Sequence, residues 1–143
     1  MKKILFFVVI ATLAYGYFQS QEVALPGPSA SLAAEIALQN AYTNRQSDIQ
    51  VKGAGKVTKL LSDDLDGSRH QRFILMLGSG ETLLVSHNID LAPRINSLKV
   101  GDVVEFHGEY EWNDKGGVVH WTHHDPDGRH IAGWIKHQGN TYQ

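Results

Sequence analysis

The chain reads Val103-Val104-Glu105-Phe106-His107-Gly108-Glu109-Tyr110-Glu111-Trp112-Asn113-Asp114-Lys115-Gly116-Gly117-Val118-Val119-His120-Trp121-Thr122-His123-His124 towards its C-terminal end. Apolar and polar residues alternate on both sides of a polar, glycine-containing turn at 113–116. Alternation with a period of two is typical of a β-strand that is buried on one face. The stretch therefore predicts an antiparallel hairpin with strands over 103–112 and 118–124.

The length of this turn determines which residues of the two strands lie opposite each other. With the turn at 113–116, Glu109 faces His120 and Glu105 faces His124. One face of the hairpin then collects the apolar side chains Val104, Phe106, Tyr110, Val119 and Trp121. We expect this face to lie in the core, with Trp121 covering the gap that Gly108 leaves.

The opposite face of the hairpin carries carboxylates and imidazoles. Its members are Glu105, His107, Glu109, His120 and His124. Imidazole nitrogen and carboxylate oxygen together suit divalent transition metals, so Glu105, Glu109, His120 and His124 are candidate ligands of an ion such as zinc. Two other interpretations stay open. The face is a pH-responsive patch, or it is a row of cross-strand pairs that contribute about 0.2–1 kcal/mol each.

A second group of polar residues surrounds the turn at 125–128, whose Asp-Pro-Asp-Gly sequence is typical of a type I turn. His123, Asp125 and His130 are candidate catalytic residues, with His123 as a general base that Asp125 orients. Together with His124 they suggest a metal-dependent phosphodiesterase or nuclease. The alternative is that Asp125 caps its own turn while His123 packs against a tryptophan.

The period of two begins near residue 49. Further strands are predicted over 49–61, 72–77 and 82–87, followed by a loop with a short helical turn over 88–97. Gly53 and Gly55 permit the bend or bulge that a long first strand needs. Five strands with a helical segment between the third and fourth predict an all-β, OB-like barrel. A five-stranded sandwich or an SH3-like barrel is the alternative.

The N-terminal end resembles an export signal. Lys2 and Lys3 precede an uncharged apolar run over 4–18, which predicts a secretory signal peptide. If it is not cleaved, residues 1–18 attach the protein to the inner membrane, although the run is shorter than the roughly 20 residues of a comfortable membrane span. We therefore expect a periplasmic or secreted protein.

The remaining chain divides into three parts. These are a linker over 19–31, a helix over 32–46 and the OB-like domain over 47–143. The domain has no cysteine, so burial alone must stabilise it. Without Lys2 and Lys3 the 13 basic residues become 11, against 15 acidic ones. This acidic balance argues against a nonspecific nucleic-acid binder, whose affinity comes from neutralised phosphates.

The function that the sequence favours is binding of a polymeric ligand, either single-stranded nucleic acid or an oligosaccharide. In an OB topology the first loop and the loop between strands four and five flank the ligand face. The candidate contacts are Lys56, Lys59, Arg69, His70, Arg72, Trp112 and His124. Ordinary surface charge explains any one of them equally well. An envelope module that binds another protein is a further alternative.

Four segments carry a resemblance to a known family. They are Arg69-His70-Gln71-Arg72-Phe73, His87-Asn88-Ile89-Asp90-Leu91-Ala92-Pro93-Arg94, Gly108-Glu109-Tyr110-Glu111-Trp112 and Lys115-Gly116-Gly117-Val118-Val119-His120-Trp121-Thr122-His123-His124-Asp125-Pro126. With them the chain, over about 50–142, resembles a family of small exported bacterial proteins classed as the domain of unknown function DUF3465. The resemblance implies an exported OB-like domain of Gram-negative bacteria, and it implies no activity.

Overall fold

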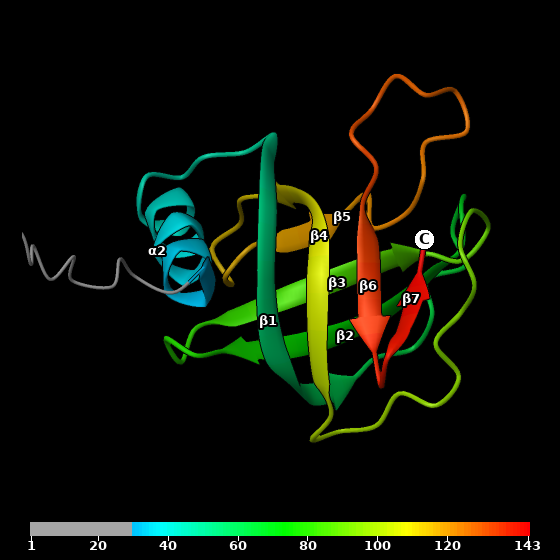
Figure 1. Ribbon diagram of the computed structural model, residues 1–143, viewed down its shortest axis with the longest axis horizontal. Coiled ribbons are helices and arrows are strands. Elements are labelled where there is room, and N and C mark those ends of the chain that lie inside the picture. The colour runs from blue at the N-terminus through cyan, green and yellow to red at the C-terminus, as the bar shows by residue number, and fades with distance from the viewer. Residues whose placement is uncertain (1–29) are drawn as a thin grey trace, which may run out of the picture.

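The computed structural model describes residues 30–143 (Figure 1). Its elements are α2 (Ala30–Thr43), β1 (Ile49–Leu60), β2 (His70–Leu77), β3 (Thr82–Asn88), β4 (Val103–Glu111), β5 (Val118–His120), β6 (Trp134–His137) and β7 (Asn140–Tyr142). The predicted signal over 1–18, and the linker apart from residues 30 and 31, lie outside the described residues. Between residues 30 and 143, no helix has the length and apolar character that a membrane crossing requires.

Strand pairing closes the sheet into a barrel. The strands follow the order β1-β2-β3-β5-β4, and β4 pairs with β1 to complete the ring. All these neighbours are antiparallel except β3 and β5, which run parallel. This is the strand order of an OB-type barrel, so the predicted five-stranded barrel is confirmed.

β1 belongs to both halves of the barrel. Its first part pairs with β4 and its second part with β2, and Gly55 pairs with both neighbours at the bend. A side chain at Gly53 would collide with the ring of Phe106, and one at Gly55 would press on Leu75. A bulge follows between Val57 and Lys59. The predicted glycine bend is therefore confirmed, because the core side chains fill the space that the glycines leave.

Two segments cover the ends of the barrel core. Helix α2 contributes Leu38 and Ala41 to the core at one end, and the loop over 89–102 contributes Ile95 at the other (Figure 1). The buried amide of Gln71 holds this loop, since it donates to the carbonyl of Ile95 and accepts from its N–H. The short helical turn predicted in the loop is present as one turn, which the Ala92 N–H closes onto the Asn88 carbonyl.

Helix α2 begins and ends earlier than the predicted range of 32–46, and its first two residues lie in the predicted linker. Arg45 adopts a left-handed conformation with φ of 53°. The N–H of Gln46 bonds to the carbonyl of Ala41, and that of Arg45 bonds to Tyr42. This double bond pattern is a Schellman C-cap, which stops the helix although no glycine marks its end.

The last predicted strand is too long. β5 ends at His120, and Trp121 turns the chain away with φ of 52°. Residues 121–133, which we call the excursion, project beyond the barrel before the chain returns as β6 (Figure 1). β5 and β6 pair with the same edge of β4. β5 pairs with residues 109–111 of β4, and β6 pairs with residues 104–107. The β6–β7 hairpin was not predicted.

The excursion is anchored to the core by Thr122. Its hydroxyl bonds to Nδ1 of His87 at 2.8 Å, and its methyl group lies 3.0 Å from the place that a Cβ at Gly108 would take. The space over Gly108 is occupied by the backbone oxygen of His120 and by the methyl groups of Thr122 and Val119, so the prediction that Trp121 covers it is wrong. Trp121 is only partly buried, because the turn at this residue directs the indole outward to the excursion.

Candidate functional site

Two glutamates and a histidine converge on the outer face of β4 and β5. The predicted pairing of Glu109 with His120 is confirmed. Nε2 of His120 lies 3.4 Å from Oε1 of Glu109 and 3.5 Å from Oε1 of Glu111. One ligand atom from each of the three residues lies within 4.8 Å of the other two. Nε2 of His120 is buried and has no hydrogen-bond partner. We call these three residues the Glu-Glu-His cluster.

His130 reaches the cluster from the excursion. Its Nε2 donates to Oε2 of Glu109 at 2.6 Å, and its Nδ1 donates to the carbonyl of Ile131 at 2.8 Å. Burial opposes the charged form of His130, but these hydrogen bonds outweigh burial and raise the pKa of its imidazole. The ring stacks on Trp121, with centroids 4.0 Å apart. The Glu109 carboxylate and the Ile131 carbonyl can only accept hydrogen bonds, so both ring nitrogens of His130 donate. The geometry therefore fits an imidazolium.

The structure separates the predicted metal set. Glu105 pairs with Lys136 of β6, so its predicted position opposite His124 is wrong. The reason is that β5 ends at His120 and the chain beyond it enters the excursion, where His124 is exposed. Glu109 and His120 remain together, and Glu111 takes the third position because it lies two residues from Glu109 on the same face of β4.

The predicted catalytic residues of the turn do not converge. The carboxylate of Asp125 accepts hydrogen bonds from the N–H groups of residues 127, 129 and 130. These hydrogen bonds stabilise the ionised carboxylate and lower the pKa of Asp125, and the bond from the Asp127 N–H has the largest effect. His123 bonds to the carbonyl of His124 and packs against Trp121, with centroids 5.3 Å apart. His130 instead points to Glu109. Turn capping and packing therefore account for His123 and Asp125.

The predicted cationic contacts of the polymer are mostly engaged within the domain. Arg69 forms an ion pair with Asp90 at 2.6 Å. Arg72 donates twice to the carbonyl of Ser62, and His70 bonds to the carbonyl of Ser68. Lys56 and Lys59 are exposed on β1. Arg69, His70 and Arg72 therefore stabilise the first loop, whereas Lys56 and Lys59 stay exposed.

Trp112 has a structural position. Its indole packs against the core, and its Nε1 donates to the carbonyl of Tyr42 at the end of α2. The guanidinium of Arg45 lies 5.2 Å from the ring centroid and covers the indole. Trp112 therefore fastens the helix to the barrel through its packing and its indole N–H.

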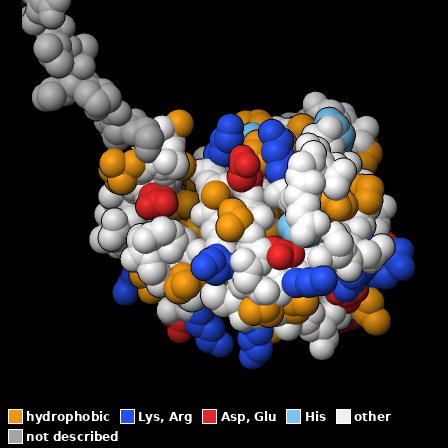
Figure 2. All heavy atoms as spheres, turned by 60° about the horizontal axis from the view of Figure 1, so that its bottom comes forward, with side chains coloured by type: hydrophobic (Ala, Val, Ile, Leu, Met, Phe, Trp, Pro, Cys, Tyr) orange, Lys and Arg blue, Asp and Glu red, His pale blue; other side chains and the backbone are white. Residues whose placement is uncertain are grey.

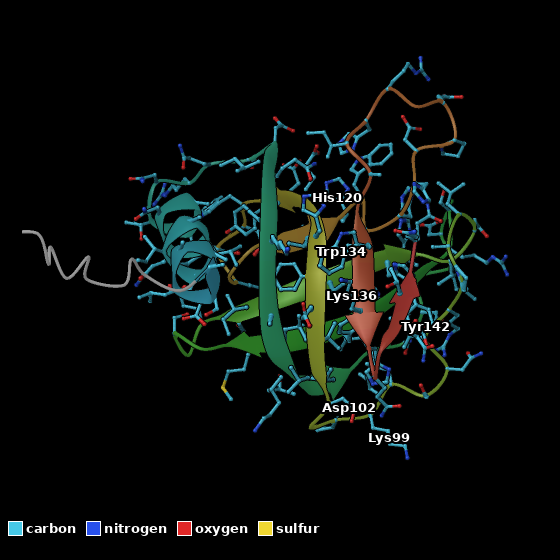
Figure 3. All side chains as sticks on the ribbon, viewed as in Figure 1. Lys99, Asp102, His120, Trp134, Lys136 and Tyr142 are labelled. Atoms are coloured by element: carbon cyan, nitrogen blue, oxygen red, sulfur yellow. The ribbon has the colours of Figure 1, made fainter. Side chains whose placement is uncertain are left out.

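A different tryptophan lies on the outer face of the sheet. Trp134 of β6 lies next to His107, with ring centroids 6.0 Å apart. Nζ of Lys136 is 4.6 Å from the indole centroid, and Nζ of Lys52 on β1 is 5.5 Å from it. Figure 3 shows His120, Trp134 and Lys136 in succession down the sheet beside β4. We call Trp134, Lys52 and Lys136 the Trp134 platform.

Sequence reasoning missed the Trp134 platform, although a signal for β6 and β7 exists. Trp134 and Ile135 are residue types that favour strands, and Gln138-Gly139 follows two residues later as a two-residue turn. Both turn residues have positive φ, 49° and 79°. This is the pattern of a tight hairpin, and it places Trp134 and Lys136 on one face.

The surface beside the platform is hollowed and mixed in charge. A groove runs along the β6–β7 hairpin and is lined by Val103, Glu105, Lys136, Gln138 and Thr141. On the face drawn in Figure 2, lysine and arginine side chains are interspersed with acidic and apolar ones. The drawn face therefore has no continuous basic surface of the kind that dominates nonspecific nucleic-acid binders.

Comparison with known proteins shows the family of the chain. None of the curated proteins matches it. A family model described as "Protein of unknown function (DUF3465)" matches residues 23–143, which is most of the chain. The chain therefore belongs to the DUF3465 family.

Proposed function

We propose that this domain binds single-stranded nucleic acid on the outer face of β1, β4 and β6. The observation that carries the proposal is the Trp134 platform, in which two ammonium groups lie within 4.6 and 5.5 Å of one indole centroid. An aromatic face that stacks a base, next to cations that neutralise phosphates, is the combination that single-strand binders use. One stacked base contributes about 1–3 kcal/mol.

The charges around the platform set the expected strength of binding. Lys52 and Lys136 are exposed, and Glu105 lies opposite Lys136 in the register of β4 and β6. Two neutralised phosphates on a single strand give a slope of about −1.4 when log affinity is plotted against log salt. We therefore expect weak, salt-sensitive binding that is measurable at low ionic strength.

The test is fluorescence anisotropy with a labelled deoxythymidine oligonucleotide at low salt. Trp134→Ala should weaken binding by roughly 5- to 150-fold, the equivalent of one stacked base. Lys52→Gln should weaken binding and flatten the salt dependence. Lys115→Gln is the matched control, because Lys115 is also exposed but lies in the turn between β4 and β5. It should bind as the wild type does.

Two outcomes would overturn the proposal. The first is an oligonucleotide affinity that Trp134→Ala leaves unchanged. The second is the absence of salt-sensitive binding together with binding of a neutral oligosaccharide, which would assign the platform to sugar stacking. In addition, we propose export to the periplasm or beyond on the strength of the leader sequence over 1–18.

A further inference from the structure

We propose that Glu109, Glu111 and His120 bind a divalent transition metal ion of the zinc type. The proposal does not rest on nucleic-acid binding. It stands on the spacing of the ligand atoms, on two unpartnered buried atoms and on the hydrogen bond from His130. These three observations are independent of one another.

The spacing of the Glu-Glu-His cluster fits a tetrahedral ion. Zinc holds nitrogen and oxygen ligands at about 2.0–2.2 Å, which places neighbouring ligand atoms of a tetrahedron about 3.3–3.6 Å apart. Nε2 of His120 lies 3.4 Å from the Glu109 oxygen and 3.5 Å from the Glu111 oxygen. Two edges of the tetrahedron therefore have the required length without movement of the backbone.

One of these ligand atoms, Nε2 of His120, lacks a hydrogen-bond partner within the protein. Across residues 30–143, only three buried side-chain nitrogen or oxygen atoms have no hydrogen bond, and two of them are Nε2 of His120 and Oε1 of Gln50. His120 and Gln50 are the residues paired with Glu109 on its two sides. A buried polar atom without a partner loses the hydrogen bond that water gave it, so it destabilises the folded state. A cation beside Glu109 would satisfy the imidazole nitrogen and neutralise two adjacent carboxylates.

His130 orients the central ligand. Its Nε2 binds Oε2 of Glu109 at 2.6 Å, which leaves Oε1 directed at His120. Metal-binding carboxylates are commonly held by such an outer hydrogen bond, and its loss lowers metal affinity about 10- to 100-fold. Glu109, Glu111 and His120 supply three ligands. A tetrahedral ion then keeps a fourth position for water or for the amide oxygen of Gln50.

Calorimetric titration of zinc into the untagged, chelator-treated protein tests the site. We expect one ion per chain and a rise in Tm on zinc addition, since a ligand of the folded state stabilises it. His120→Ala and Glu111→Gln should each lower the affinity at least tenfold. His124→Ala is the matched control, because His124 belongs to the excursion, is exposed and lies outside the cluster. It should bind zinc as the wild type does.

Cobalt provides a second readout that does not depend on affinity alone. In place of zinc, cobalt(II) should give the intense visible absorption of a tetrahedral site in the wild type, and His120→Ala should lose it. Circular dichroism should show that each variant is folded. Trp134→Ala should bind zinc normally, so a failure of the metal site and a failure of the nucleic-acid proposal are distinguishable.

The proposal is overturned if the wild type takes up no zinc at a concentration of 100 µM, on the order of weak biological sites. It is also overturned if folded His120→Ala binds zinc with wild-type affinity. Loss of binding in His124→Ala, with binding retained in His120→Ala, would move the ion into the excursion.

Discussion

Replacement of His87 by glutamine should remove a large part of the domain's acid sensitivity. His87 belongs to β3, and its fully buried side chain bonds to Thr122 of the excursion. Its Nε2–H donates to the carbonyl of Pro93, so its Nδ1 must accept from the Thr122 hydroxyl. The ring is therefore held in its neutral form, and a glutamine amide can supply one donor and one acceptor without titrating.

The size of the effect follows from the pKa of His87. Burial lowers this pKa from 6.5 to about 4, although the hydrogen bond that Nε2–H donates to the Pro93 carbonyl opposes the shift. Between pH 6.5 and 4, His87 is protonated in the unfolded chain but neutral in the folded state. The free energy of unfolding therefore decreases as the pH falls through this window. The complete cost is about 3.4 kcal/mol, of which about 2.5 kcal/mol is lost between pH 7.5 and 4.5.

Urea unfolding of both proteins at pH 7.5 and 4.5 measures this difference. The free energy of unfolding should fall by about 2.5 kcal/mol more in the wild type than in His87→Gln. Comparison of the two proteins cancels other titrations, such as that of Asp102. The hydrogen bond from His137 lowers the pKa of Asp102, so its contribution is lost only at more acidic pH. Equal pH dependence in a folded His87→Gln variant would refute the reasoning.

Three further changes test the positions of individual residues. Trp112→Ala should lower the free energy of unfolding by about 2 kcal/mol, because the indole fastens α2 to the barrel, and should leave oligonucleotide affinity unchanged per folded molecule; a selective loss of affinity would restore Trp112 as a ligand contact. Gly133→Ala should cost about 1–3 kcal/mol in urea unfolding, since the new methyl group meets the backbone oxygens of Trp121 and His107; an unchanged midpoint would contradict the close approach. Deletion of residues 1–18 should keep the protein in the cytoplasm with an unchanged Tm, because the described core begins at Leu38; fractionation and thermal unfolding check both, and continued export would exclude the signal.

The alternation of apolar and polar residues was enough to predict the barrel. A strand with one buried face shows a period of two whatever its partners are, so the ranges of β1, β3 and β4 could be read locally. The turn at 113–116 determined the register of Glu109 with His120 in the same way, since a hairpin is a local structure. The glycine bend of β1 was also visible, because Gly53 and Gly55 interrupt a long strand.

The end of β5 could not be predicted from alternation. Residues 121–124 continue the pattern of the strand, yet Trp121 turns left-handed and the chain leaves the sheet. The outcome depends on which segment pairs with residues 104–107 of β4. In the folded protein β6 occupies that edge, and the chain at His120 and Thr122 lies against Gly108. The two segments that compete for this edge are distant in sequence, so the local pattern of either one does not show which of them pairs.

In the candidate sites too, contacts within one hairpin could be predicted, whereas contacts between distant segments could not. The sequence by itself determined that Glu109 and His120 share a face, because the pairing of a hairpin follows from its turn. Only the tertiary structure decided that His130 returns to Glu109, that Trp134 lies beside Lys52, and that Trp112 is used to hold α2. These contacts depend on the path of the excursion and on the closure of the barrel. Both arise from packing between segments far apart in the chain, which residue periodicity does not encode.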